Sequence, residues 1–343
     1  MNLYKILVIT IAVLGVFSCS KSNTETYERF YFENNGASLA VQVDGNRTSK
    51  TFILLLHGGP GGSGFEYNTG KYTEILEQDY AMVYLDQRGQ GASKGSYSVE
   101  DVTLQQFSDD IAALSTFLKQ KYGTDISLFL MGHSWGGTTG THALLNTDVQ
   151  TELKGWIEVD GAHDIPLLNK EAIKMFLEIG NAEISAGNNT EKWQDIVDFA
   201  AGVDTNNISV DEGGQINGYG FEAEGLIAQI AAGGSGDPSH GLLTSPLTSA
   251  TNALAGLLTA NTINGETEKA SMTADLNKIT IPSLFLWGKY DFVVPPSLGE
   301  MAFNNVSSTK KEVVIFEKSG HSPMDSEPDL FAEKVIQFVE LHK

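Results

Sequence analysis

The segment 132–137, which reads Gly-His-Ser-Trp-Gly-Gly, constrains the fold of this chain more than any other. It follows a short apolar run, 126–131, and precedes a stretch compatible with a helix, 138–145. A Gly-x-Ser-x-Gly turn between a strand and a helix is so tight that side chains at the glycine positions would clash, and it holds the serine in a strained backbone conformation. The pattern therefore predicts that Ser134 is a nucleophile with its hydroxyl at the mouth of a pocket.

Short apolar runs alternate with segments of helical periodicity along the chain. The expected strands are 51–56, 80–85, 126–131, 155–159, 283–287 and 312–316, and the expected helices are 67–76, 104–121, 138–145 and 328–341. A continuous apolar run such as 51–56 is typical of a strand buried on both faces of a parallel sheet. Two alternating runs within 28–43, separated at an Asn-Asn-Gly turn, add an edge hairpin. The pattern predicts an α/β domain, a mostly parallel central sheet with helices on both faces.

The alternation of strands and helices stops between residues 163 and 275. Helical patterns at 170–178, 191–200 and 226–232 are joined by Gly, Asn and Ser-rich stretches, and 204–212 is expected to be a solvated loop. We therefore expect a mainly helical insertion, the cap (163–275), over a core formed by 28–162 and 276–343. The cap contains 16 Asp and Glu against four Lys, so it carries more than half of the formal net charge of −21.

A serine hydroxyl needs a base to remove its proton, and the best-placed histidine is His321. It lies in a Ser-Gly-His-Ser-Pro segment just after the last expected strand. A carboxylate must in turn orient the imidazole, and Asp291 follows the penultimate strand. Asp160 and Asp164, after an earlier strand, are the alternatives. The order Ser134, Asp291, His321 is the order nucleophile, acid, base.

Acyl transfer also needs N–H donors aimed at the developing oxyanion. One is expected from the backbone of Trp135, the residue after the nucleophile. The other is expected from the segment 57–61, His-Gly-Gly-Pro-Gly, which follows the buried strand 51–56. Because Pro60 has no N–H, Gly59 is the best candidate in this segment. It matches neither of the common phosphate-binding glycine patterns, and no cofactor or metal is expected.

Taken together, these motifs resemble the proline iminopeptidase family of α/β-hydrolases. The resemblance is carried by 57–61, by the Asp-Gln-Arg-Gly-Gln-Gly-Ala-Ser segment 86–93 and by 132–137, and it extends over most of 28–160 and 276–343. It implies an α/β-hydrolase fold and the release of an N-terminal residue, usually proline, by a metal-free Ser-Asp-His triad. The corresponding triad positions here are Ser134, Asp291 and His321, and the corresponding oxyanion donors are Gly59 and Trp135. Asp86 and Arg88 would be structural.

Two features depart from that family. His133 stands in the turn where proline iminopeptidases commonly carry a small residue. In addition, the cap offers no glutamate pattern that identifies the group that would pair with a substrate ammonium. The candidates are Glu178, Glu183, Glu222 and Glu224.

The N-terminus has the composition of a targeting segment. Residues 6–17 form an almost unbroken apolar run after Lys5, too short to span a bilayer comfortably. The run ends at a small residue followed by Cys19, the only cysteine in the chain. This predicts a lipoprotein-type signal peptide (1–18), lipidation at Cys19, a polar tether (19–27) and a membrane-anchored location in a bacterial cell envelope. An ordinary secretory signal is the alternative.

The sequence therefore predicts a serine hydrolase that acts on a small peptide or amide through an acyl-enzyme. One alternative is an esterase of small carboxylic esters that uses the same triad. Another is a non-catalytic envelope binding protein on a hydrolase scaffold. The strong negative charge excludes nucleic acid as an expected partner.

Overall fold

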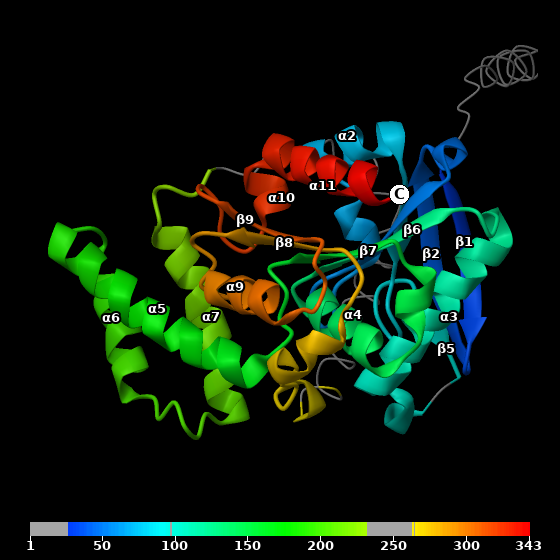
Figure 1. The fold of residues 1–343 in the computed structure, drawn as a ribbon. Coiled ribbons are helices and arrows are strands. Elements are labelled where there is room, and N and C mark those ends of the chain that lie inside the picture. Colours follow the sequence, from blue (N-terminus) through cyan, green and yellow to red (C-terminus); the bar gives the residue numbers. More distant parts are fainter. Residues whose placement is uncertain (1–26, 97, 232–262, 264) are drawn as a thin grey trace, which may run out of the picture.

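The computed structural model describes residues 27–96, 98–231, 263 and 265–343 of the chain (Figure 1). The expected signal peptide, the lipidation site Cys19 and almost all of the tether lie outside the described residues. So does the cap segment 232–262. Among the helices of the described part, none combines the length and apolarity needed to cross a membrane.

In the part of the chain that the structure describes, a nine-stranded sheet with the order β1-β2-β4-β3-β6-β7-β8-β9 forms the centre of the molecule, with β5 paired to β2. Strands β3, β4, β6, β7, β8 and β9 run parallel, and β1 and β2 form the antiparallel hairpin at one edge. The bounds are Glu28–Asn34 (β1), Ala37–Gly45 (β2), Thr51–Leu56 (β3), Ala81–Leu85 (β4), Lys94–Gly95 (β5), Ser127–His133 (β6), Gly155–Val159 (β7), Ser283–Gly288 (β8) and Lys311–Phe316 (β9). The mostly parallel sheet predicted from the sequence is confirmed, and every expected strand is present.

Helices cover both faces of the sheet (Figure 1). One face carries α2 (Lys71–Asp79), α10 (Pro323–Ser326) and α11 (Pro328–His342), and the other carries α3 (Leu104–Tyr122), α4 (Trp135–Asn146) and α9 (Pro296–Asn305). Alternate residues of β3 explain why its sequence is apolar throughout. Leu54 packs in the cluster on the α3 side and Leu55 in the cluster on the α11 side, and both are buried.

Two helix starts differ from those expected from the sequence. The segment before α2 is a short 3-10 turn, Gly64–Tyr67, so α2 begins at Lys71 rather than at residue 67. Helix α4 begins at Trp135, three residues before the expected start. Consequently β6 passes into α4 through Ser134 alone, which is the arrangement that the glycines around it permit.

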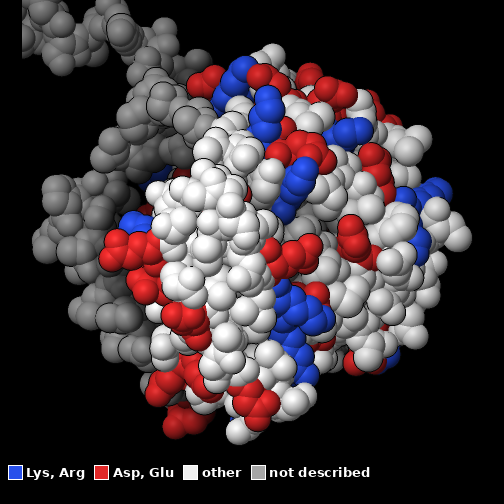
Figure 2. Space-filling model, turned by 90° about the vertical axis from the view of Figure 1, so that its left-hand side faces the viewer, with Lys and Arg blue, Asp and Glu red and all other residues white. Residues whose placement is uncertain are grey.

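Helices α5 (Ile165–Ala186), α6 (Thr190–Gly202) and α7 (Val210–Leu226) of the cap follow β7. They enclose a further apolar cluster that includes Phe176 and Trp193. Phe292, from the loop after β8, is fully buried in this cluster and stacks on Phe176 at 6.0 Å between ring centroids. In Figure 1 these helices extend beyond the β8–β9 edge of the core. Figure 2 shows the face on that side, where acidic and basic side chains border a broad uncharged area.

The helix expected at 226–232 is wrong, because α7 ends at Leu226. The expectation of a solvated loop at 204–212 is wrong in its last residues, because α7 begins at Val210. Ser209 and Glu212 form a reciprocal capping box that starts the helix. Five glycines inside α7 hide its helical character, since glycine disfavours a helix by roughly 1 kcal/mol relative to alanine.

Candidate active site

Ser134 occupies the turn between β6 and α4 with φ 55° and ψ −118°, a conformation that is rare for a residue with a side chain. The flanking glycines make this turn possible. A Cβ on Gly132 would lie 2.3 Å from the carbonyl oxygen of Gly136, and one on Gly136 would lie 2.1 Å from that of Leu56. The surrounding structure holds the turn in this strained conformation. In this conformation Ser134 lines a pocket.

The structure brings Ser134, His321 and Asp291 together from three separate loops. Nε2 of His321 lies 2.9 Å from Oγ of Ser134, and Nδ1 of His321 lies 2.9 Å from Oδ2 of Asp291. Asp291 is fully buried, and its other oxygen accepts hydrogen bonds from the N–H groups of Val293 and Val294. These contacts orient the carboxylate, which fixes the imidazole with Nδ1 protonated and Nε2 free to accept the serine proton.

Burial governs the protonation of this pair. Removal from water lowers the pKa of His321, against the opposing influence of the acidic groups Asp160 and Glu224. Burial also raises the pKa of Asp291, and the N–H groups that it accepts from oppose that rise. A histidine with a lowered pKa is neutral at neutral pH, which is the state that a general base requires.

Of the two alternative acids, neither bonds the imidazole of His321 through its side chain. Asp164 caps α5 by accepting from the N–H of Leu167, and it also accepts from Ser271. Asp160 is fully buried at the end of β7 and accepts from the N–H of Gly288 on β8. Burial, and then the charge of Asp291, raises the pKa of Asp160 well above its ordinary value.

The residues His133, Asp160 and His321 have potential ligand atoms within 4.8 Å of one another. The hydrogen bonds of the two histidines leave neither ring with a nitrogen free to coordinate a metal ion. Both ring nitrogens of His133 have partners, Tyr67 and the carbonyl of His321, and both ring nitrogens of His321 belong to the triad. We therefore interpret the two histidines as members of the hydrogen-bond network of the site, with Asp160 buried beside them and bonded to Gly288.

The expected oxyanion donors line the same pocket as Ser134. Trp135 is the first residue of α4, so its N–H has no acceptor within the helix. In the loop after β3, the N–H groups of Gly58 and Gly61 donate to Tyr67 and Gln90. Since Pro60 has no N–H, this geometry is compatible with Gly59 as the donor from that loop.

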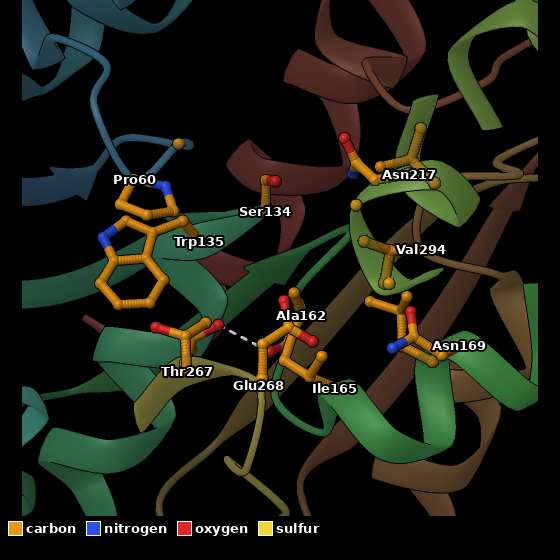
Figure 3. Close-up of a pocket in the computed structure, with 16 residues that line it drawn as sticks. Pro60, Ser134, Trp135, Ala162, Ile165, Asn169, Asn217, Thr267, Glu268 and Val294 are labelled. Carbon is orange, nitrogen blue, oxygen red and sulfur yellow. Dashed lines mark hydrogen bonds between the residues drawn. The ribbon is translucent and has the colours of Figure 1, made fainter. Parts of the chain in front are cut away.

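A cavity of about 230 Å³ opens beside Ser134, between the core and the cap. Figure 3 shows Pro60 and Trp135 on one side of it and Asn169, Asn217 and Val294 on the other. The apolar part of the lining comes from Ala162, Ile165, Leu168, Val293 and Val294.

Among the described residues that line this cavity, Glu268 is the one carboxylate. Burial raises its pKa. None of the four glutamates considered from the sequence lines the cavity: Glu178 and Glu222 are exposed, and Glu183 accepts from Asn188 at the surface. Sequence reasoning missed Glu268 because no motif surrounds it, and only the fold shows which cap residues face the nucleophile.

The fourth of those glutamates, Glu224 on α7, contacts the catalytic loop instead. Its Oε2 accepts from the backbone N–H of His321 at 3.1 Å. It fills the space beside Gly320, where a Cβ would lie 2.3 Å from Oε2 of Glu224. On the previous turn of α7, Phe221 places its ring edge-on to His321 at 5.9 Å. The cap thus packs directly on the loop that carries the candidate base.

Asp86 and Arg88 are buried in the loop after β4. Asp86 accepts from Ser63 and from the N–H groups of Gly64 and Ala92, which ties together the loops after β3 and β4. Arg88 forms a two-pronged ion pair with Asp110 on α3, at 2.7 and 2.8 Å. These contacts agree with the structural roles that the resemblance implied.

The chain belongs to the alpha/beta hydrolase family, whose model matches residues 53–334. It is 24% identical to a probable aminopeptidase of Bacillus subtilis over 308 residues, which cover 88% of this chain and 93% of the relative. It is 23% identical to a proline iminopeptidase of Saccharolobus solfataricus over 324 residues, which cover 92% of each chain. A shorter match, 32% identical over 74 residues, covers 21% of this chain and 30% of a monoacylglycerol lipase from a Bacillus species. The predicted likeness to proline iminopeptidases is thereby confirmed.

Solved structures share the fold. The crystal structure of VinJ matches with a TM-score of 0.60 at 20% identity, covering 92% of this chain and 99% of that one. An esterase from a Rhodococcus species matches with a TM-score of 0.57 at 19% identity, covering 93% and 100%. These likenesses confirm the α/β-hydrolase architecture.

Proposed function

We propose that the protein is a serine hydrolase of the aminopeptidase type, which releases an N-terminal residue from a small peptide or amide. The observation that carries the proposal is the Ser134–His321–Asp291 hydrogen-bond series beside a cavity where Glu268 is the one carboxylate among the described lining residues. The series supplies acyl-transfer chemistry, and the carboxylate supplies a partner for a substrate ammonium.

In the proposed reaction, Oγ of Ser134 attacks the carbonyl carbon of the first peptide bond and its proton passes to Nε2 of His321. The N–H groups of Trp135 and Gly59 stabilise the oxyanion. When the C–N bond breaks, His321 returns the proton to the departing amine, which leaves the acyl group on Ser134. Water then attacks the acyl-enzyme with the same proton transfers and releases the residue as a free carboxylic acid.

The cavity favours a short acyl portion with a free amine. Its volume of about 230 Å³ is small for a binding pocket, and it suits one residue better than a long chain. Glu268, Asn169 and Asn217 together offer acceptors for an ammonium group. Val293 and Val294 offer an apolar wall for a side chain such as the proline ring.

An esterase that uses the same triad is the second candidate. The apolar side chains that line the cavity, among them Ile165 and Val294, also suit a short acyl chain. A direct comparison of prolyl and alanyl arylamides with short acyl esters separates the two. Cleavage of arylamides with free amines, and much weaker cleavage of their N-acetyl forms, is expected. Ester cleavage without any arylamide cleavage would establish the esterase instead. A chain that cleaves neither and reacts with no serine-directed probe would be a binding protein.

We also propose that the protein is held in a bacterial cell envelope by a lipid on Cys19. The proposal rests on the apolar run 6–17 and the single cysteine that follows it. Expression of the full chain and of Cys19→Ser, followed by membrane fractionation and mass spectrometry of the N-terminal peptide, tests it. Loss of the lipid and of the membrane-bound fraction is expected in the variant. An unchanged membrane fraction would refute the anchor.

A further inference from the structure

Two side chains, the partly buried Tyr67 and the buried His133, connect three parts of the candidate active site. The N–H of Gly58, in the loop after β3, lies 2.9 Å from the Tyr67 hydroxyl. That hydroxyl lies 2.6 Å from Nδ1 of His133, and Nε2 of His133 lies 2.7 Å from the carbonyl oxygen of His321. Gly58 precedes the candidate oxyanion donor Gly59, His133 precedes Ser134, and His321 is the candidate base.

The two ends of this series determine the direction of every hydrogen bond in it. A carbonyl oxygen only accepts, so Nε2 of His133 must carry the proton that it donates to His321. Nδ1 of His133 is then an acceptor, and the Tyr67 hydroxyl donates to it. The hydroxyl oxygen is left to accept from the Gly58 N–H, which only donates. One protonation state therefore satisfies all four groups.

We propose that Tyr67 and His133 are positioning residues. They hold the loop after β3, the Ser134 turn and the His321 loop in the relative positions that the reaction requires. His133 needs no contact with the substrate for this role, because it acts through the backbones on either side of it. The proposal rests on Ser134 being the nucleophile and holds equally for a peptide or an ester substrate.

The electrostatics of the two side chains agree with the geometry. Burial, helped by the charge that His321 acquires, lowers the pKa of His133 to about 3, so its ring is neutral near neutral pH. Burial likewise raises the pKa of Tyr67, which keeps its hydroxyl proton. The series thus keeps its proton arrangement when His321 changes charge during turnover.

The series also accounts for a histidine in a position where a small residue would suffice for the turn. The ring centroids of His133 and His321 are 4.9 Å apart, and the ring centroids of Tyr67 and His133 are 5.6 Å apart. A small residue at 133 would leave the carbonyl of His321 and the Tyr67 hydroxyl without these partners in a buried site, which costs free energy and loosens both loops.

Four substitutions test the proposal. His133→Ala removes the hydrogen bonds of His133 to Tyr67 and to His321. Tyr67→Phe removes the hydrogen bonds of the hydroxyl to Gly58 and to His133. His133→Gln places an amide N–H near the former Nε2 and can keep the link to His321, whereas His133→Asn places an amide oxygen near the former Nδ1 and can keep only the link to Tyr67. His142→Gln is the control, since His142 lies on α4 and bonds Ser108 away from the site.

The readouts are kcat and KM on the substrate that the wild type cleaves, the rate of Ser134 labelling by a fluorophosphonate, and the melting temperature. We expect His133→Ala to lose about 10- to 100-fold in kcat and in labelling rate, with KM within about twofold, because small displacements of catalytic groups have effects of this size. His133→Gln should recover more kcat than His133→Asn. Tyr67→Phe should lower kcat in the wild type and add little in the His133→Ala background.

Unchanged kcat and labelling rate in folded His133→Ala would overturn the proposal, as would equal losses in Gln and Asn variants that melt at the same temperature. Independent, additive losses from Tyr67→Phe and His133→Ala would also contradict a connected series. If His133→Ala does not fold, the Gln, Asn and Phe variants decide the outcome. Because labelling needs no substrate, a failed arylamide assay would reject the proposed aminopeptidase activity without affecting this result.

Discussion

Glu224 of the cap accepts a hydrogen bond from the backbone N–H of His321 in the core at 3.1 Å. A side chain of α7 therefore holds the loop on which the candidate base is placed. Phe221 and Gly220 make the neighbouring contacts, with the His321 ring and with the backbone of Phe292. The cap completes the arrangement of the triad as well as covering the pocket.

Substitutions of Glu224 should separate its hydrogen bond from its charge. Glu224→Gln keeps an oxygen that can accept from the His321 N–H, so we expect kcat to change by less than about threefold. Glu224→Ala leaves a buried N–H without a partner, which costs roughly 1–3 kcal/mol. It should lower both kcat and the free energy of unfolding, measured by assay and by urea denaturation. Equal activity in the Ala and Gln variants would contradict this role.

The acid limb of the pH profile should lie below the ordinary titration range of histidine. Burial lowers the pKa of His321, although Asp160 and Glu224 oppose the shift. Only the neutral imidazole accepts the serine proton, so kcat/KM should fall as the pH drops through this pKa. The midpoint, measured on a neutral substrate, should be below about 6.5. A midpoint of 7 or more would show that the surrounding carboxylates dominate.

Glu268 should recognise the substrate amine. Replacing it with Gln removes a charge-assisted hydrogen bond, which contributes roughly 1.5–3 kcal/mol. We expect KM for a prolyl or alanyl arylamide to rise about tenfold or more in Glu268→Gln. Hydrolysis of an uncharged acyl ester should change little. Glu178→Gln, on an exposed position of α5, is the matched control and should leave both substrates unaffected.

Two glycines of α7 should respond in opposite ways to substitution by alanine. A Cβ at Gly220 would lie 2.9 Å from the carbonyl oxygen of Phe292, whereas one at Gly218 would meet nothing within 4 Å. Gly220→Ala should destabilise the protein by roughly 1–3 kcal/mol through overpacking. Gly218→Ala should stabilise it by up to about 1 kcal/mol through helix propensity. Thermal unfolding of both variants measures the difference, and the same sign for both would contradict the close packing of α7.

The sequence was sufficient to predict the sheet because β3 and its parallel neighbours are buried on both faces and therefore read as continuous apolar runs. It also predicted Ser134, Asp291 and His321 as one triad, and the structure places His321 within hydrogen-bond distance of both Ser134 and Asp291. These are local signals, and each depends on a few adjacent residues.

The features that the sequence did not predict depend on contacts between distant segments. Helix α7 is rich in glycine, and at Gly220 the reason is the close approach of Phe292, which only the folded chain shows. Glu268 stands in no recognisable motif, and only the folded cap places it in the lining of the same cavity as Ser134. The hydrogen bond between Tyr67 and His133 spans 66 residues, and no local pattern indicates it.

Labelling of Ser134 tests the central claim most directly. The purified protein and its Ser134→Ala variant are each treated with a fluorophosphonate, and the added mass is located by peptide mass spectrometry. We expect one label per wild-type chain, on Ser134, and neither label nor arylamide turnover in the variant. Undiminished labelling or turnover in folded Ser134→Ala would contradict the assignment of the nucleophile and, with it, the proposed mechanism.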